Sequence, residues 1–293
     1  MCTKKIPDLG AAEWFLAQHA RVADQRVYER LFHGGAAQPV RDAVLAYRNS
    51  DGGFGHALEP DCRAGASQPA AVAVALRLLD VADAWDDAVA MAACDWLASV
   101  APAEGGAAFV EGGVAQGPHA PWWVPEKGHP AALIQTGQLA GVLHTRGVRH
   151  PWLDGATAVM WDMIGRLSEP GAYPLLGVCR FLDHVPDSDR AVAALEKVRP
   201  LLLDPRVVAL DPDAAGEVHT PLDFAPLPGS VARRLFDDAT IAAHLDHLAG
   251  AQREDGGWMF SWPSWSRAAE ADWRGFLTVD ALRVLRANGR LRP

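Results

Sequence analysis

Carboxylates and histidines gather in short stretches of the 293-residue chain, and these residue types suit proton transfer. One stretch holds His56, Glu59 and Asp61 within six residues, shortly after a Gly-Gly turn. Another lies in a long Pro-rich segment, around Glu217 and Asp223. A carboxyl group that is desolvated or placed beside a second carboxylate has a raised pKa, and it can then act as an acid or a base near neutral pH. The catalytic candidates are therefore His56, Glu59, Asp61 and Asp223.

Tryptophan is abundant, with 11 residues in the chain, and several lie in loop-like stretches. An indole ring attracts cations over its face and packs well against apolar groups. A cluster of such rings with a few polar groups is typical of a site for an apolar or sugar-like ligand. The expected ligand-binding residues are four tryptophans and one histidine: Trp122, Trp123, Trp262, Trp265 and His219.

The elements that must position these side chains are helices. Apolar residues recur at spacings of three and four in about ten segments, whereas no segment alternates apolar and polar residues as a strand does. Two expected helices are long, covering residues 11–32 and 230–251, while residues 204–228 are expected to be irregular. The fold class predicted from this pattern is all-α.

A turn recurs along the chain, as Asp51-Gly-Gly-Phe54 and Asp255-Gly-Gly-Trp258. Glycine reaches positive φ without a Cβ clash, so the aromatic residue can fold back onto the preceding helix. Matching helical stretches follow both turns, and a third copy of the helix begins at Thr136, which aligns with Thr278. Repeated helical hairpins must stack or close on one another to bury their apolar faces. We expect a single domain, residues 1–293, with ten to twelve helices closed into an α/α toroid.

The stretch Gln252-Arg-Glu-Asp-Gly-Gly-Trp258 resembles the QW repeat of the squalene–hopene and oxidosqualene cyclases. The helical hairpins resemble the α/α toroid that these cyclases share with the β subunits of protein prenyltransferases. In the first copy of the turn, Arg48 and Phe54 stand at the Gln and Trp positions. The resemblance implies that Gln252 and Trp258 clamp neighbouring helices, and that an isoprenoid-like substrate enters a Trp-lined central cavity.

The resemblance leaves several functions open. The Asp-x-Asp-Asp acid motif of the cyclases does not occur in the chain, and neither does the Cys/His spacing of a prenyltransferase zinc site. One hypothesis is a terpene cyclase-like enzyme that uses carboxylate acid/base chemistry on an isoprenoid-like substrate. A second is a glycan-active α/α barrel, and a third is a toroid that binds a small molecule or a protein without catalysis.

Composition and charge limit the kinds of molecule that the protein is expected to bind. The net charge is −9 and the basic residues form no run, which argues against nucleic acid. No stretch has the roughly 20 apolar residues of a membrane helix, and residues 1–8 lack the apolar segment of a secretion signal. Four scattered cysteines indicate neither disulfides nor a thiolate metal site. We expect a cytoplasmic protein that takes a small apolar substrate and needs no metal or other cofactor.

Overall fold

The computed structural model describes residues 6–291. Over this range the chain forms twelve α-helices and two short 3₁₀ helices, and its only strand-like pairings are isolated bridges. The all-α prediction is confirmed. The α-helices are α1 (Leu9–His19), α2 (Val22–His33), α3 (Ala37–Leu45), α4 (Pro69–Val81), α5 (Asp87–Ser99), α6 (Leu133–Thr145), α7 (Pro151–Arg166), α8 (Ala172–Leu182), α9 (Ser188–Leu202), α10 (Pro221–Phe224), α11 (Asp238–Gly250) and α12 (Arg267–Ala287), with 3₁₀ helices η1 (Gly112–Gln116) and η2 (Val231–Leu235).

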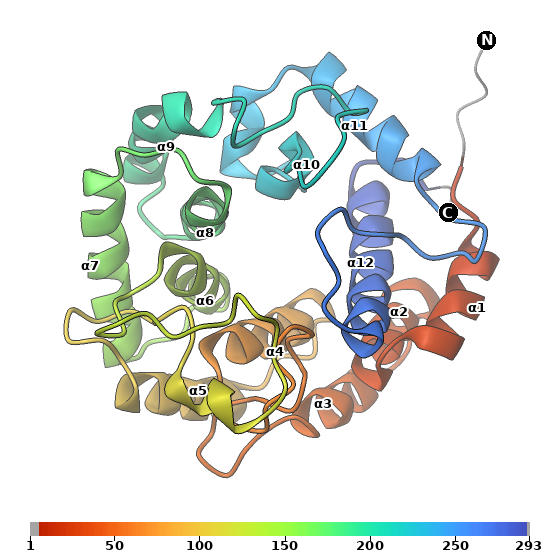
Figure 1. The fold of residues 1–293 in the computed structure, drawn as a ribbon. Coiled ribbons are helices and arrows are strands. Elements are labelled where there is room, and N and C mark those ends of the chain that lie inside the picture. The colour runs from red at the N-terminus through yellow and green to blue at the C-terminus, as the bar shows by residue number, and fades with distance from the viewer. Residues whose placement is uncertain (1–5, 292–293) are drawn as a thin grey trace.

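The helices form a ring of two layers (Figure 1). The even-numbered helices lie inside and the odd-numbered helices lie outside. Going round the inner layer, α12 contacts α2, and α2, α4, α6, α8 and α10 follow, each in contact with the next. Because outer and inner helices alternate along the chain, the loops that precede inner helices all emerge at one end of the ring. We call this end the loop face; it is formed by residues 55–68, 101–132, 203–220 and 251–266.

Small residues let the inner helices approach closely. A Cβ atom on Gly137 of α6 would lie 2.1 Å from the carbonyl oxygen of Gly177 on α8, so neither backbone has room for a side chain there. Gly141, one turn further along α6, meets the Arg180 carbonyl in the same way, at 2.4 Å. The glycines therefore determine how tightly α6 and α8 pack.

Two of the long helices expected from the sequence are each divided. The segment 11–32 breaks at Ala20 and Arg21, which are extended, so that α1 is an outer helix and α2 an inner one. The segment 230–251 contains η2 and then α11, whose N-cap Asp237 accepts the Thr240 N–H at 2.6 Å. The apolar spacing continues through both breaks, so helical periodicity does not reveal where the chain changes layers. Residues 204–228 are irregular except for the single turn of α10.

The Gly-Gly turns fasten each loop to the inner helix that follows it. The Trp258 N–H donates to Thr278 Oγ1 on α12 at 3.0 Å, and its Nε1 donates to the Leu248 carbonyl on α11 at 2.9 Å. In the third copy the Ala107 N–H donates to Thr136 Oγ1 at 3.0 Å. The predicted match between Thr136 and Thr278 is thus present as a shared contact, with Ala107 at the aromatic position.

Gln252 joins the two ends of the ring. Its Oε1 accepts the Asp8 N–H at 2.7 Å, and its Nε2 donates to the Asp8 carbonyl at 2.8 Å and to the Gly256 carbonyl at 2.9 Å. Gly256 has φ of +93°, and a Cβ there would lie 2.0 Å from the Ala11 carbonyl oxygen. The turn after α11 therefore packs directly onto α1, and these contacts form the seam of the ring.

Two predictions from the sequence concern membrane-spanning helices and disulfide bonds. Among residues 6–291 no helix is long and apolar enough to cross a bilayer. Cys62, Cys94 and Cys179 are buried and form no disulfide, and Cys2 lies outside the described residues.

Candidate active site

The loop that carries Glu59 and Asp61 lies on the loop face, just before α4, and its backbone is held on both sides. The buried Arg21, paired with Asp24 at 2.7 Å, donates to the Leu58 carbonyl at 2.5 Å. On the other side, Arg63 pairs with Asp272 of α12 at 2.6 Å. These contacts fix the segment before α2, the loop and α12 relative to one another.

Backbone strain precedes the two carboxylates. His56 and Ala57 have φ of +56° and +67°, in the left-handed region that residues with a Cβ rarely occupy. Such a conformation costs on the order of 1–3 kcal/mol per residue, persists only where surrounding contacts enforce it, and is common at functional sites. Arg21 supplies one of those contacts, at the carbonyl next to Ala57.

Glu59 is a buried carboxyl group, 6% exposed. Its Oε2 accepts the backbone N–H of Asp61 at 2.7 Å and of Cys62 at 3.1 Å. Burial, followed by the nearby charge of Asp61, raises the Glu59 pKa to about 8, while the two N–H donors and Arg21 partly oppose this shift. Glu59 therefore holds its proton at neutral pH.

Asp61 lies among indole rings. It is 7% exposed, and its Oδ1 accepts the Trp273 Nε1–H at 3.0 Å. Burial raises the Asp61 pKa, and the N–H groups of Trp273, Trp265 and Trp122 oppose this by favouring the carboxylate. Trp265 Nε1 is buried and makes no hydrogen bond of normal geometry. A buried Glu59 with a raised pKa and an Asp61 that accepts an indole N–H thus lie two residues apart within an aromatic setting.

The predicted tryptophans take different positions around this pair. Trp122 is 45% exposed, whereas Trp123 is buried in a small core beneath the loop with Cys62. Trp262 meets Trp273 edge to face, with ring centroids 5.3 Å apart. Trp122, Trp262 and Trp265 therefore join the Asp61 site directly or through Trp273, and Trp123 supports the loop from inside.

Trp273 was absent from the sequence-based candidates although it makes the direct hydrogen bond to Asp61. It lies in the second turn of α12, where periodicity predicts an ordinary helical residue. Its distance of 212 positions from Asp61 left no local signal that the two meet. Only the closure of α12 against the first repeat brings them together.

Two catalytic candidates have other partners. His56 is exposed, and its Nε2 lies 2.8 Å from Asn49 Oδ1. Asp223 Oδ2 accepts the Thr220 N–H at 2.6 Å and the Thr220 hydroxyl at 2.9 Å, which caps the one-turn helix α10. Their side-chain contacts are local, and neither makes a hydrogen bond to Glu59 or Asp61 among the interactions found in residues 6–291.

The polar stretch around Glu217 and Asp223 nevertheless lies on the loop face, as Glu59 and Asp61 do. Tyr173, at the start of α8, donates to Glu217 Oε1 at 3.0 Å and packs edge to face on His219, with centroids 5.2 Å apart. Burial, then Glu217, and then the charge of Asp61 raise the Tyr173 pKa to about 12. The electrostatic effect of Asp61 on Tyr173 links the two polar stretches across the loop face.

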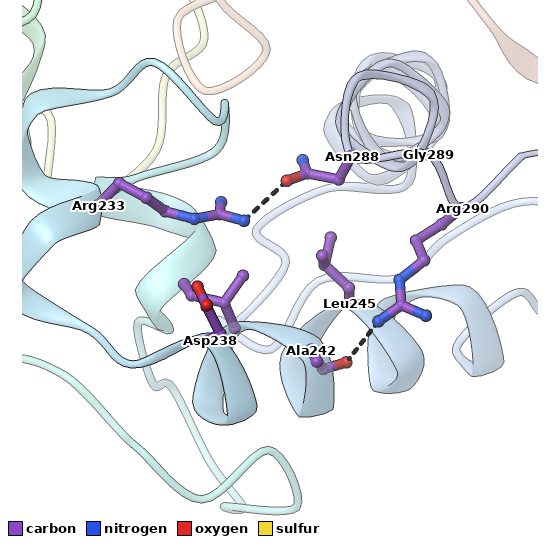
Figure 2. A pocket seen from close by; sticks show the side chains of 8 residues that line it. Arg233, Asp238, Ala242, Leu245, Asn288, Gly289 and Arg290 are labelled. Atoms are coloured by element: carbon purple, nitrogen blue, oxygen red, sulfur yellow. Dashed lines mark hydrogen bonds between the residues drawn. The ribbon is translucent and has the colours of Figure 1, made fainter.

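One cavity lies away from Glu59 and Asp61, at the other end of the ring. A cavity of about 320 Å³ lies between α11 and the end of α12, lined by Arg233, Asp238, Asn288 and Arg290 (Figure 2). Arg233 bridges to Asn288 Oδ1 there at 2.9 Å. Since this cavity adjoins the start of an outer helix and the end of an inner one, it is at the ring end opposite Asp61. No three His, Cys, Asp or Glu side chains in residues 6–291 are placed to hold a metal ion.

The fold has a counterpart among solved structures. A crystal structure of a protein from Actinoplanes matches with a TM-score of 0.56 and 18% sequence identity, over 94% of this chain and 90% of that chain. At this identity the similarity concerns the fold alone. No protein-family model matches the chain, and no curated protein matches it.

Proposed function

We propose that the protein is an isomerase-type enzyme that transfers protons on an isoprenoid-like apolar substrate, with Glu59 and Asp61 as its acid and base. The observation that carries the proposal is the pair itself: a buried Glu59 whose pKa is raised to about 8, beside an Asp61 fixed by an indole N–H. A donor and an acceptor held together near neutral pH are the groups that general acid–base catalysis requires.

The pKa of Glu59 also bears on the kind of reaction. A carboxyl group with a pKa of about 8 is a weak acid, so it suits proton transfer at an activated position, such as a carbon beside a carbonyl. It does not suit protonation of an unactivated double bond, which begins cyclisation in the families that the sequence resembles. We therefore propose proton transfer and not ring formation.

The surroundings support an apolar substrate. Trp122 is half exposed beside the pair, and Trp262 stacks on Phe260 with centroids 4.6 Å apart. Such rings offer a surface that binds apolar groups and excludes water from the reacting atoms. Asp223 and His56 are outside this proposal because their polar atoms are engaged by Thr220 and Asn49.

The test is solvent-deuterium exchange. Isoprenoid alcohols, aldehydes and acids, together with a set of oligosaccharides, would be incubated with the protein in D₂O and analysed by mass spectrometry. We expect deuterium in an isoprenoid carbonyl compound, and a loss of about 100-fold or more in E59Q and D61N, which is the usual size of a general acid–base contribution. The rate of the unmodified protein should fall above about pH 8, because Glu59 then loses its proton.

The variant D223N tests whether the acid and base are Glu59 and Asp61 or whether Asp223 takes part. Retained exchange in D223N supports the Glu59–Asp61 pair, whereas loss in D223N with retention in E59Q would contradict it. Cleavage of an oligosaccharide would favour the glycan-active alternative instead.

A further inference from the structure

The inside of the ring, below the loop face, carries a cluster of charges. Arg77 of α4 pairs with Asp280 of α12 at 2.6 Å, and Arg283 of α12 pairs with the same Asp280 oxygen, Oδ1, at 2.9 Å. Arg180 of α8 is close enough to act electrostatically on both Arg77 and Asp280. Arg77 and Arg180 are each the ninth residue of their helix, which places both about 12 Å along the inner wall at 1.5 Å per residue.

The three arginines of the cluster differ in their carboxylate partners. Two guanidinium groups share one carboxylate oxygen of Asp280, and Arg180 donates only to the Asp223 backbone carbonyl, at 3.1 Å. Two carboxylates near Arg180 have other partners: Asp223 Oδ2 accepts from Thr220, and Asp183 Oδ1 accepts the Val231 N–H at 2.6 Å. Among the described residues Arg180 thus makes no ion pair, whereas Arg77 and Arg283 share Asp280.

These charges are accessible and not sealed in the core. The side chains of Arg77 and Asp280 are 31% and 26% exposed, although they lie on inner helices. Although burial raises the Asp280 pKa, Arg77, Arg283 and Arg180 hold it well below its usual range, so the carboxylate stays charged. An entering anion would therefore meet a permanently charged, partly hydrated cluster.

An aromatic row connects this cluster to the loop face. Trp273, Phe276, Asp280 and Arg283 follow one another at spacings of three, four and three, so they share one face of α12. The Trp273 and Phe276 rings are 5.8 Å apart, and the Arg77 guanidinium lies 4.6 Å from the Phe276 centroid. From Trp273 to Asp280 the helix rises about 10 Å, so an apolar chain of that length would run from the Asp61 site to the arginines.

We propose that Arg77, Arg180 and Arg283 bind the carboxylate of an apolar carboxylic acid whose hydrocarbon part lies along Trp273 and Phe276. Arg180, which makes no ion pair among the described residues, would pair with the entering carboxylate. Arginine recognises a carboxylate through several N–H donors, and Arg283 already directs two of its nitrogens to Asp280 Oδ1, at 3.0 Å and 2.9 Å. Identifying this acid as the substrate rests on the proposed function and requires a second carbonyl at its far end, beside Asp61, whereas the binding site is tested by binding alone.

The experiment is calorimetric titration with decanoate, decanol and decyl phosphate at constant ionic strength. We expect decanoate to bind at least tenfold more tightly than decanol, and at least as tightly as decyl phosphate. R180Q should remove the advantage of decanoate over decanol. D280N should strengthen decanoate binding, because Arg77 and Arg283 then lose the carboxylate that they share. R286Q is the control: Arg286 is on α12, the helix of Asp280 and Arg283, but stacks on Phe32, with 4.4 Å to the ring centroid.

Equal binding of decanoate and decanol, an unchanged preference in R180Q, or an equal loss in R286Q would each overturn the carboxylate site. Tighter binding of decyl phosphate would overturn the assignment of a carboxylate. E59Q should bind decanoate as the unmodified protein does, so loss of exchange in E59Q with intact binding separates failure of the chemistry from failure of this site.

Discussion

Replacing Glu59 by glutamine should change how stability depends on pH. Glu59 has a pKa of 4.5 when exposed and about 8 in the folded protein, so between these values the folded state binds more protons than the unfolded state. Its contribution to stability is full below about pH 4.5 and is lost as the pH rises through 8. For one such group, the free energy of unfolding falls by about 2–3 kcal/mol between about pH 6 and pH 9.

Glutamine removes this term while keeping the local hydrogen bonds, because its side-chain oxygen still accepts the Asp61 and Cys62 N–H groups. The measurement is urea unfolding of the unmodified protein and E59Q at both pH values. The difference between the two proteins isolates Glu59 from the other titrating groups. We expect E59Q to lose less stability than the unmodified protein, by about 2–3 kcal/mol. Identical losses in the two proteins would refute a buried, protonated Glu59.

Three further predictions concern the seam and the repeats, each measured as the free energy of urea unfolding. W258A should lower it by about 3–5 kcal/mol, since a fully packed ring and its hydrogen bond are lost; a change below 1 kcal/mol would show that the ring is not a clamp. Q252A should cost about 2 kcal/mol or more because the buried Gly256 carbonyl and the part-buried Asp8 backbone lose their partner, whereas R48A, at the exposed equivalent position, should stay within about 0.5 kcal/mol. G256A should cost about 3 kcal/mol or more, but G216A, with similar φ and open space around it, only about 1 kcal/mol; equal costs would contradict the close contact with Ala11.

Sequence periodicity predicted the helical class and most helix positions because the inner and outer helices each bury one apolar face. It did not locate the break at Ala20 and Arg21, since apolar residues continue at helical spacing on both sides. The recurring Gly-Gly turn indicated the repeat because positive φ restricts the choice of residue, as at Gly52 and Gly256. A local sequence pattern therefore predicts those helices and turns whose formation depends mainly on neighbouring residues.

The candidate site was only partly predictable for the same reason. Glu59 and Asp61 are close in sequence, and proximity of two carboxylates already implies a raised pKa. Burial of Glu59 depends on the packed ring, and the hydrogen bond from Trp273 to Asp61 depends on contact between the first and last repeats. Asp223 has the same residue type in a comparable loop, yet its carboxylate caps α10. Residue type alone makes Asp61 and Asp223 equal candidates. Their tertiary contacts differ, because Asp61 accepts a hydrogen bond from Trp273 whereas Asp223 caps α10.

The seam between Asp8 and Gln252 bears on how the chain is made. These residues are 244 positions apart, and α1 and α2 both pack against α12, near the other end of the sequence. At a synthesis rate of about 5–20 residues per second, the first helices would wait roughly 10–50 s for their partners to be translated. During that time Phe15 and Leu16, buried in the finished ring, would have no α12 to cover them. The apolar side of α1 therefore stays uncovered until α12 has been made, and the contact between Asp8 and Gln252 can form only after most of the ring has been synthesised.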